Sequence, residues 1–262
     1  MTVCRSRTID RKRMHPLNVY KKLPQKNCGK CSAATCMAFA VQFLRRMVPL
    51  TECPELHDAA REEIAAMLSD TVDWKERRLK ELLEEILRMD ISIRAEDLGA
   101  QFKDGSLRLR YLGRDIHLDN STFREDLEIW DKLLLLLYIK QSGQGPLAGR
   151  WVAFRDLKDG MIRSEAFHDE CEIPVAELFK SGGKELINKL DAMGAERLSG
   201  FLTENAYVLN VLPRIPVLIL LWPGDDDFAA DCKILLDSTA TVFLDVEALL
   251  YLGIALVRAL KD

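Results

Sequence analysis

The sequence predicts an α+β protein in which a small N-terminal helical module precedes a larger mixed α+β domain. The length of 262 residues fits a small module and a larger domain, since domains usually hold about 100–200 residues. Four cysteines gather between positions 28 and 53. Strand-like runs farther along cluster between helices rather than alternating with them regularly, which favours α+β over a doubly wound sheet.

The predicted boundaries follow changes in composition. Residues 1–13 are a basic tail, expected to be disordered; residues 14–56 form the cysteine-bearing module; residues 57–262 form the α+β domain with a helical connector at its start. Hydrophobic residues make up 48% of the chain and charged residues 30%, as in an ordinary globular protein. Composition alone therefore predicts a folded core and no particular activity.

Charge is distributed unevenly along the chain. Residues 1–56 carry 11 Lys and Arg against 3 Asp and Glu, whereas the remainder carries 26 against 38. A basic front module is suited to docking an acidic partner, such as a redox protein, or to attracting the acidic body. The basic residues lack interleaved aromatic residues and precede no nucleic-acid-binding motif, so no nucleic-acid partner is expected.

The chain is expected to be cytoplasmic and not membrane-spanning. No stretch reaches the roughly 18–20 unbroken apolar residues that a membrane helix needs, and no apolar segment follows the N-terminal charges as in a secretory signal. In the reducing cytosol, seven cysteines are more typical of metal ligands and free thiols than of disulfides.

The module is predicted to contain two helical segments. Residues 16–20 form an apolar-faced turn or helix closed by Leu23 and Pro24. A second helix begins at Cys36, with Thr35 placed to cap it, and ends near Pro49.

The first part of the body is predicted to change from helix to sheet. Apolar spacing of three and four over residues 57–89 indicates two helices divided near Asp70 to Asp73. Alternation over residues 100–119 predicts a three-stranded meander, with tight turns at Asp104-Gly105 and at Gly113. Residues 121–140 then predict a helix, followed by a loop over 143–149.

In the second part of the body, the sequence predicts a strand over residues 151–154 and a helix over residues 174–190. The pair Gly182-Gly183 is placed to divide this helix. Three β-rich runs follow, at 207–212, 217–222 and 241–244. The last element is a helix over residues 246–260.

The cysteine spacing is the strongest chemical signal. Cys28, Cys31, Cys36 and Cys53 follow the pattern Cys-x2-Cys-x4-Cys-x16-Cys. Soft thiolates select an iron–sulfur cluster or zinc. Structural zinc usually takes two close ligand pairs, whereas here three ligands share one loop and the fourth follows alone after a helix. The spacing favours a cubane [4Fe-4S] cluster, with zinc as the alternative.

The residues around the cysteines suit a bound anion. The helix that begins at Cys36 would direct the positive end of its dipole toward the thiolate-ligated cluster. Gly29 and the small residues 32–34 would let backbone N–H groups approach the inorganic sulfides.

These segments resemble a known domain. Residues 18–24, the run Asn27-Cys28-Gly29-Lys30-Cys31, the run 35–40 and Cys53-Pro54 are similar to the iron–sulfur domain of corrinoid iron–sulfur protein large subunits and of Rnf-type B subunits. In that domain family the matching cysteines hold one [4Fe-4S] cluster, which implies the same for Cys28, Cys31, Cys36 and Cys53. In the corrinoid protein the cluster reductively reactivates a cobalt centre used in methyl transfer.

The resemblance covers about residues 15–56. The barrel and cobalamin-binding domain of the corrinoid protein are not expected here, because the remaining residues lack a regular βα alternation. The rest resembles an uncharacterised family that joins this module to an α+β domain, through residues 149–155, 212–216 and 221–225. That second resemblance implies no activity.

Other candidate sites are weaker. His15, His57, His117 and His168 are scattered, and Cys4, Cys171 and Cys232 are too few for a second cluster. Asp225 to Asp227 predict an exposed acidic turn, since the loop lacks the spaced ligands of a calcium site. The chain has no hydrolase or kinase motif.

One further group of residues, Trp151, Phe154, Arg155 and Arg214, suits either a pocket for a flat anionic ligand or ordinary core packing. The functional hypotheses follow from the predicted cysteine site and from this candidate pocket. The first is an iron–sulfur electron-transfer or redox-accessory protein with one [4Fe-4S] cluster, which serves a redox protein, a corrinoid protein or another partner of a one-carbon pathway. The second is a cluster-dependent reductase whose C-terminal domain binds a small ligand or cofactor, and the third is a binding module in which the cluster is purely structural. Whether the chain is an enzyme stays open.

Overall fold

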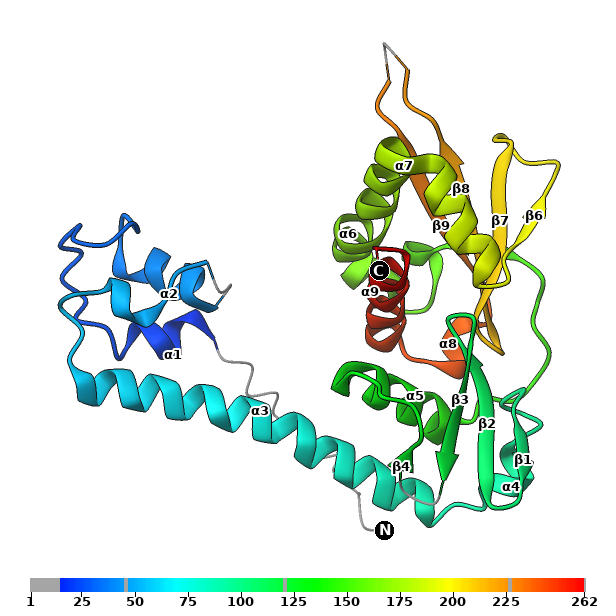
Figure 1. Cartoon of the computed structure of the whole chain (residues 1–262), viewed down its shortest axis with the longest axis horizontal. Helices are drawn as coiled ribbons and strands as arrows, with labels where there is room; N and C mark the ends of the chain where they lie inside the picture. Colours follow the sequence, from blue (N-terminus) through cyan, green and yellow to red (C-terminus); the bar gives the residue numbers. More distant parts are fainter. Residues whose placement is uncertain (1–14, 45–46, 120–121, 226–227, 262) are drawn as a thin grey trace, which may run out of the picture. The chain divides into compact units, whose positions relative to one another are not determined.

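The computed structural model describes residues 15–44, 47–119, 122–225 and 228–261, and of residues 68–73 it describes only the backbone. The predicted tail over residues 1–13 lies outside the described residues. The chain divides into two compact units, with the division between Arg77 and Arg78 (Figure 1). A mixed α+β protein with a helical N-terminal region is confirmed.

The N-terminal unit contains two short helices, α1 (Pro16–Tyr20) and α2 (Cys36–Leu44), and a 3-10 turn at Leu50–Glu52. Pro16 stands in the first turn of α1, where its missing N–H costs nothing, and His15 Nδ1 accepts a hydrogen bond of 3.2 Å from the Leu17 N–H. Both helices start where the sequence predicts. Their apolar faces meet in one small core with the following buried residues: Val19, Leu23, Ala33, Phe39, Ala40, Cys53, Leu56 and Ile64.

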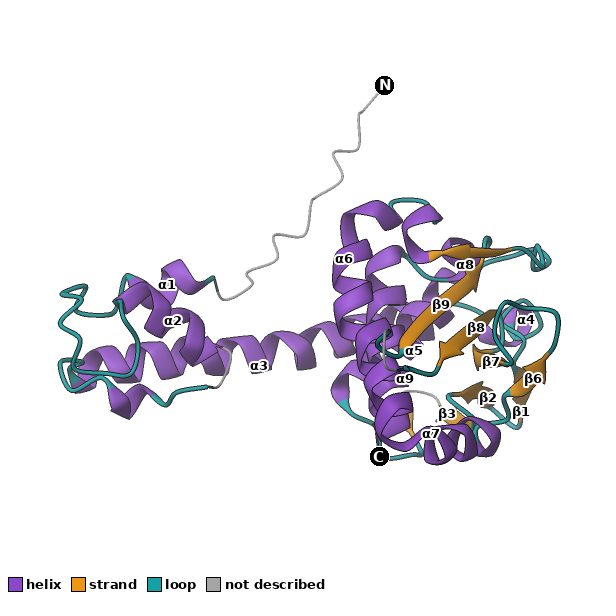
Figure 2. Ribbon diagram, turned by 90° about the horizontal axis from the view of Figure 1, so that it is seen from above, coloured by secondary structure: helices purple, strands orange, loops and turns teal. Residues whose placement is uncertain are grey.

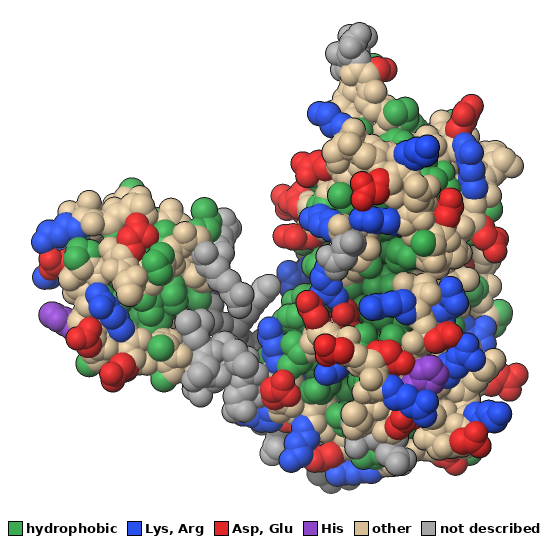
Figure 3. Space-filling view, viewed as in Figure 1, with side chains coloured by type: hydrophobic (Ala, Val, Ile, Leu, Met, Phe, Trp, Pro, Cys, Tyr) green, Lys and Arg blue, Asp and Glu red, His purple; other side chains and the backbone are tan. Residues whose placement is uncertain are grey.

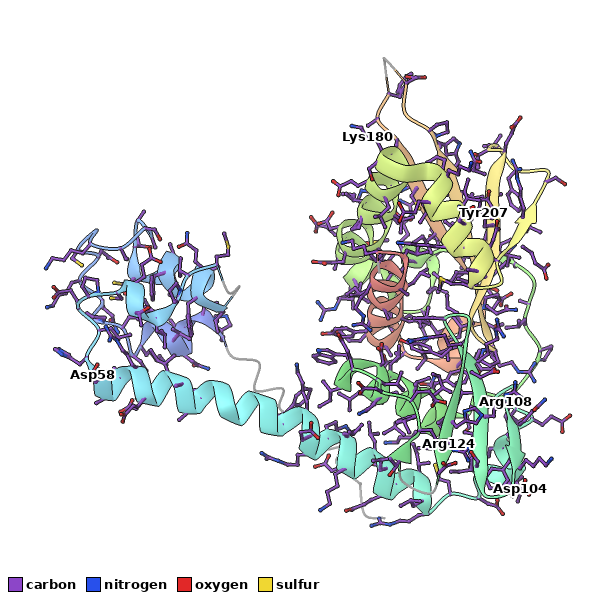
Figure 4. All side chains as sticks on the ribbon, in the orientation of Figure 1. Asp58, Asp104, Arg108, Arg124, Lys180 and Tyr207 are labelled. Carbon is purple, nitrogen blue, oxygen red and sulfur yellow. The ribbon has the colours of Figure 1, made fainter. Side chains whose placement is uncertain are left out.

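Helix α3 (Asp58–Leu87) corrects one prediction. The sequence predicts two helices divided near Asp70, but the backbone continues as one helix of 30 residues. Asp, Thr and Val lower helix propensity by less than about 1 kcal/mol each, and no Gly or Pro interrupts the run. Asp58 begins the helix (Figure 4), and Ile64 in its second turn is fully buried in the N-terminal core.

The first sheet is an antiparallel meander of β1 (Gln101–Lys103), β2 (Ser106–Tyr111), β3 (Arg114–Asp119) and β4 (Thr122–Phe123). The three-stranded prediction missed β4, which pairs Phe123 with Leu118. The helix predicted from Ser121 begins only at Ile129 in α5 (Ile129–Gln141), because Phe123 is taken up by the sheet. Arg108 on β2 and Arg124 after β4 mark this region in Figure 4.

Both predicted hairpin turns are confirmed. Asp104 and Gly105 have φ of 52° and 77°, and Leu112 and Gly113 have φ of 47° and 77°, as a two-residue turn with two left-handed positions requires. At Gly113 a Cβ would lie 2.6 Å from the Met193 Cα, so only glycine fits there. The Leu112 N–H donates to the Val211 carbonyl at 3.0 Å and links this turn to the second sheet.

The second sheet is antiparallel, with the order β5-β9-β8-β7-β6. Its strands are β5 (Trp151–Ala153), β6 (Glu196–Leu198), β7 (Asn205–Leu212), β8 (Ile215–Trp222) and β9 (Asp231–Asp237). The sequence prediction missed β6 and β9. Central β8 is buried along nearly its whole length, as its unbroken apolar run indicates.

The strand predicted over residues 241–244 is wrong. Ala240–Phe243 forms the single helical turn α8, with Phe243 fully buried. The carboxylate of Asp237 accepts hydrogen bonds from the Thr239 N–H at 2.9 Å and from its hydroxyl at 2.5 Å. These bonds turn the chain out of β9, so the β-branched residues that follow have no strand to pair with.

Further helices lie in the second unit. They are α4 (Ile91–Arg94), α6 (Ser164–Phe167), α7 (Ile173–Ala192) and α9 (Val246–Lys261), with 3-10 turns at Phe154–Asp156 and Gly160–Arg163 and a π-helical turn at His168–Glu172. Gly182 interrupts α7 with φ of −158°, which confirms the predicted division. Helices α7 and α9 lie on one face of the sheet (Figure 2), where they enclose the main core.

A buried ionic group joins α5 to α9 in this unit. Arg258 donates to both carboxylate oxygens of Asp131 at 2.6 Å, and the Tyr111 hydroxyl donates to the same carboxylate at 2.7 Å. Asp131 is 5% exposed, so its charge depends on these partners.

Candidate metal centre

The four predicted cysteines line one pocket of the N-terminal unit. Cys28 and Cys31 lie in the loop between α1 and α2, Cys36 is the first residue of α2, and Cys53 follows the 3-10 turn. Leu23, Phe39 and other apolar side chains form the inner wall. The pocket thus brings together thiols that are up to 25 positions apart in the sequence.

The cysteine loop is shaped by left-handed residues and a side-chain bridge. Asn27 and Gly29 have φ of 46° and 66°, which lets the chain reverse on either side of Cys28. The Asn27 side-chain oxygen accepts a hydrogen bond of 2.8 Å from the Cys36 N–H. Because this bond spans nine residues, it draws the start of the loop to the start of α2.

Thr35 caps α2, as the sequence predicts, because its hydroxyl accepts a bond of 3.0 Å from the Ala38 N–H. Two of the first helical amides are therefore bonded to side chains, Cys36 to Asn27 and Ala38 to Thr35. The expected favourable dipole remains, since it belongs to the aligned peptides of the whole helix.

Two glutamates attach the segment of the fourth cysteine to the cysteine loop. Glu52 accepts a bond of 2.9 Å from the Ser32 N–H. Glu55 accepts bonds from the ammonium groups of Lys26 at 3.0 Å and Lys30 at 2.6 Å. Cys53 lies between these glutamates, so both sides of its segment are joined to the loop of Cys28 and Cys31.

The same contacts set the protonation of the rim. Hydrogen bonds from Lys30 and Lys26 lower the pKa of Glu55 to about 2, and the hydrogen bond to Ser32 lowers the pKa of Glu52. Burial raises the pKa of the Cys53 thiol, and the neighbouring thiols Cys31, Cys36 and Cys28 raise it further. A bound metal cation would offset this effect and favour the deprotonated thiolates, because the thiolate is the form of cysteine that binds metals.

The donor set fits an iron–sulfur group. Four soft thiols line the pocket, and no imidazole does. Within the described residues, no three His, Cys, Asp or Glu side chains converge tightly enough to hold one metal ion. A cubane does not require such convergence because each thiolate binds a different iron, whereas zinc draws four sulfurs to about 2.3 Å from one centre.

The other sequence candidates lie apart from this pocket. His57 is exposed and does not line it. His117 pairs with Glu125 and His168 with Glu172, each at 2.8 Å. Cys171 and Cys232 are fully buried in the core of the second unit, where burial raises the pKa of both thiols.

Two of the four candidate residues for an anionic pocket, Phe154 and Arg214, have other partners. Phe154 is buried and stacks on Phe167 with ring centroids 4.2 Å apart. Arg214 donates to the backbone carbonyls of Asp97 at 3.0 Å and Glu96 at 2.9 Å. These contacts favour the core-packing interpretation. In the predicted acidic turn, Asp226 and Asp227 lie outside the described residues.

Charges of both signs interleave over the face of the second unit seen in Figure 3. Residues 90–259 match the family model described as "Domain of unknown function (DUF3786)". The chain belongs to the DUF3786 family. The predicted resemblance of the body to an uncharacterised α+β family is thereby confirmed, and the DUF3786 domain coincides with most of the second compact unit.

The N-terminal segment matches a second model. Residues 23–55 match the model described as "Putative Fe-S cluster", which supports an iron–sulfur cofactor. The segment is 41% identical over 56 residues to the gamma subunit of the acetyl-CoA decarbonylase/synthase complex of Methanothermobacter thermautotrophicus. It is 48% identical over 50 residues to the corrinoid/iron-sulfur protein large subunit of Moorella thermoacetica. The predicted resemblance to corrinoid iron–sulfur large subunits is confirmed.

These matches are local. They cover 21% and 19% of this chain, and 12% and 11% of the two relatives. No solved structure is significantly similar to the chain. None of the helices in the described part of the chain is both long and apolar enough to cross a membrane.

Sequence reasoning missed the residues that hold the cysteine segments together. Asn27, Glu52 and Glu55 each stand within two positions of a cysteine, which was the available signal. The spacing of these residues in the sequence does not predict which loop atoms donate hydrogen bonds to the two glutamates. That pairing depends on the path of the chain through α2.

Proposed function

We propose that Cys28, Cys31, Cys36 and Cys53 hold one [4Fe-4S] cluster and that the chain is a cytoplasmic electron-transfer or redox-accessory protein. The observation that carries the proposal is a pocket lined by four cysteine thiols in a segment that matches an iron–sulfur family. When bound, the cluster would supply one-electron chemistry. We also propose a cluster domain over residues 14–56, with the first turns of α3 completing its core, and an α+β domain over 57–262.

The chain's own residues would position and partly desolvate the cluster. Leu23, Ala33 and Phe39 exclude water from its inner side, since each is no more than 5% exposed. Cys36 is the first residue of α2, so the positive end of the helix dipole lies at the thiols and would stabilise their negative charge. Lys30 carries a positive charge in the loop between Cys28 and Cys31. Low dielectric and nearby charge are the means by which a protein sets a cluster potential.

The proposed partner is a redox protein, with a corrinoid protein as the first candidate. Two similar proteins are named as subunits of the acetyl-CoA decarbonylase/synthase complex and as a corrinoid/iron–sulfur protein, and both include this segment. The DUF3786 domain would then select or position the partner.

Electron exchange tests this function against the alternatives. The reduced protein is mixed with an oxidised corrinoid protein, and the cobalt absorbance is followed in a stopped-flow instrument. Fast single-electron exchange without turnover by the protein alone is expected. A cofactor that co-purifies with the DUF3786 domain and is reduced there would favour the reductase hypothesis instead. If iron removal melts the module but leaves partner binding intact, the cluster is structural.

A further inference from the structure

The four cysteines differ strongly in exposure. Cys28 is exposed, Cys31 and Cys36 are half-buried, and Cys53 is 6% exposed. Behind Cys53 lies the apolar core of Leu23, Phe39 and Ile64. A group held by all four would therefore reach solvent on the Cys28 side and be enclosed on the Cys53 side.

Gly29 keeps the Cys28 side open. A Cβ built at Gly29 would have no atom within 4 Å, and its φ of 66° is a conformation that other residues rarely adopt. The backbone beside the exposed ligand therefore carries no side chain that would hold a partner away.

Two lysines border this opening. Lys26 and Glu55 line the pocket, and Lys30, in the same loop, donates to that Glu55 carboxylate at 2.6 Å. The Lys26 and Lys30 side chains are 63% and 59% exposed even though both contact Glu55. Because one glutamate pairs with two ammonium groups, Lys26, Lys30 and Glu55 together carry a net positive charge. Lys30 stands two positions after Cys28 and directly before Cys31 in the cysteine loop.

The charge of the whole module has the same sign. Residues 14–56 carry 6 basic against 2 acidic residues, and an oxidised cluster with its four thiolates would subtract about two charges. The excess therefore remains positive. Such a field attracts an acidic surface and can raise the rate constant of association by about 10-fold to 1,000-fold.

We propose that electrons enter and leave the module over Cys28 and Gly29, at an edge where Lys26 and Lys30 dock a partner protein that presents carboxylates around its own redox centre. This proposal rests on the proposed function. We call residues 26–30 the exposed edge. The partner's carboxylates would replace Glu55 as acceptors for the two ammonium groups.

Small redox probes of opposite charge test the exposed edge directly. The reduced full-length protein is mixed with anionic cobalt(III)–EDTA or with cationic cobalt(III) tris-phenanthroline. Each probe molecule takes one electron from the protein, so cobalt(III) becomes cobalt(II). In the double variant Lys26→Gln/Lys30→Gln the second-order rate constant with the anionic probe should fall about threefold or more, and that with the cationic probe should rise. Added salt should reduce both effects, since about 0.1 M salt screens charges beyond about 10 Å.

Two variants control for charge and for folding. Lys158→Gln/Lys184→Gln removes the same charge from exposed positions of the second unit, and both rate constants should stay as in the wild type. Lys26→Arg/Lys30→Arg keeps the charge and should restore the anionic rate. Iron and sulfide content of each variant is measured first, so that only fully loaded proteins are compared.

A second readout involves no electron transfer. Microwave power saturation of the reduced protein's EPR signal is measured with added chromium(III) trioxalate, a paramagnetic anion. Relaxation enhancement should be strong in the wild type and weaker in Lys26→Gln/Lys30→Gln. Unchanged probe rates and unchanged relaxation in a fully loaded double variant would overturn the edge assignment and leave the cluster intact. Wild-type protein that takes up no iron and sulfide would overturn the proposed function, and the edge with it.

Discussion

The N-terminal module and the C-terminal body are stabilised by different means. In the described part of the N-terminal unit, eight buried residues form the core, and the cysteine segments are held by hydrogen bonds that Asn27, Glu52 and Glu55 accept. The body encloses a far larger apolar core between its sheet and helices. Modules of about 40 residues usually need a metal or disulfides, whereas a core of the body's size suffices by itself. The comparison indicates that metal loss should affect the module and leave the body folded.

The largest expected effect is the loss of one thiol from the module. Cys36→Ser should abolish the cluster or convert it to a form with fewer irons, because a hydroxyl is a harder and weaker ligand than a thiolate. Iron content, sulfide content and EPR of the reduced protein measure this. Cys171→Ala is the matched control, since it removes a buried thiol of the body and should leave iron content unchanged.

The next effect is confined to the body. Arg258→Met removes both hydrogen bonds that Arg258 Nη2 donates to Asp131 and leaves that buried carboxylate with the Tyr111 hydroxyl. The free energy of unfolding of the body should fall by about 3 kcal/mol, as for a broken buried ion pair. Urea unfolding followed by tryptophan fluorescence measures it. Arg155→Met, at an exposed position, should change the value by less than about 0.5 kcal/mol. If Arg258→Met lowers iron content instead, the two units are not independent.

These two units also differ in how much the sequence predicts. The cysteine spacing and Thr35 locate the pocket and the start of α2, because ligand spacing and capping are local signals. Strand β9 was missed because Lys233 interrupts its apolar run and the charged residues Asp231 and Asp237 stand at its two ends. Lys233 is retained in the strand by an ion pair of 2.9 Å with Glu172, a contact 61 residues away that no local pattern reveals.

Acid should weaken the body through Asp237. Its carboxylate is 2% exposed and accepts bonds from the backbone N–H groups of Ala148, Gly149 and Thr239. Burial opposes its ionisation, but hydrogen bonds from Thr239, Ala148 and Gly149 prevail and lower its pKa below 3.8. The carboxylate therefore contributes stability above the unfolded-state pKa, and this contribution is lost as the pH falls through the lower folded-state pKa.

Asp237→Asn should cost about 2 kcal/mol at neutral pH and make the body's stability less dependent on pH below about 4. Thermal unfolding between pH 2.5 and 7 measures both effects. If the difference in unfolding free energy between the wild type and the variant stays constant over that pH range, the stabilising role assigned to the Asp237 charge is contradicted.

The smallest effect is the cap of α2. Thr35→Ala removes the acceptor for the Ala38 N–H and should lower the stability of the loaded module by about 1 kcal/mol. The rate of iron loss to a chelator should rise accordingly. Thr35→Ser keeps the hydroxyl and should behave as the wild type. Equal iron-loss rates for the Ala and Ser variants would show that the cap does not support the site.

The metal content of the anaerobically purified full-length protein tests the proposed [4Fe-4S] cluster most directly. Iron and acid-labile sulfide are measured together with EPR of the reduced state. We predict about four irons and four sulfides per chain and a rhombic signal from a reduced [4Fe-4S] cluster. Zinc at one atom per chain without sulfide would contradict the account.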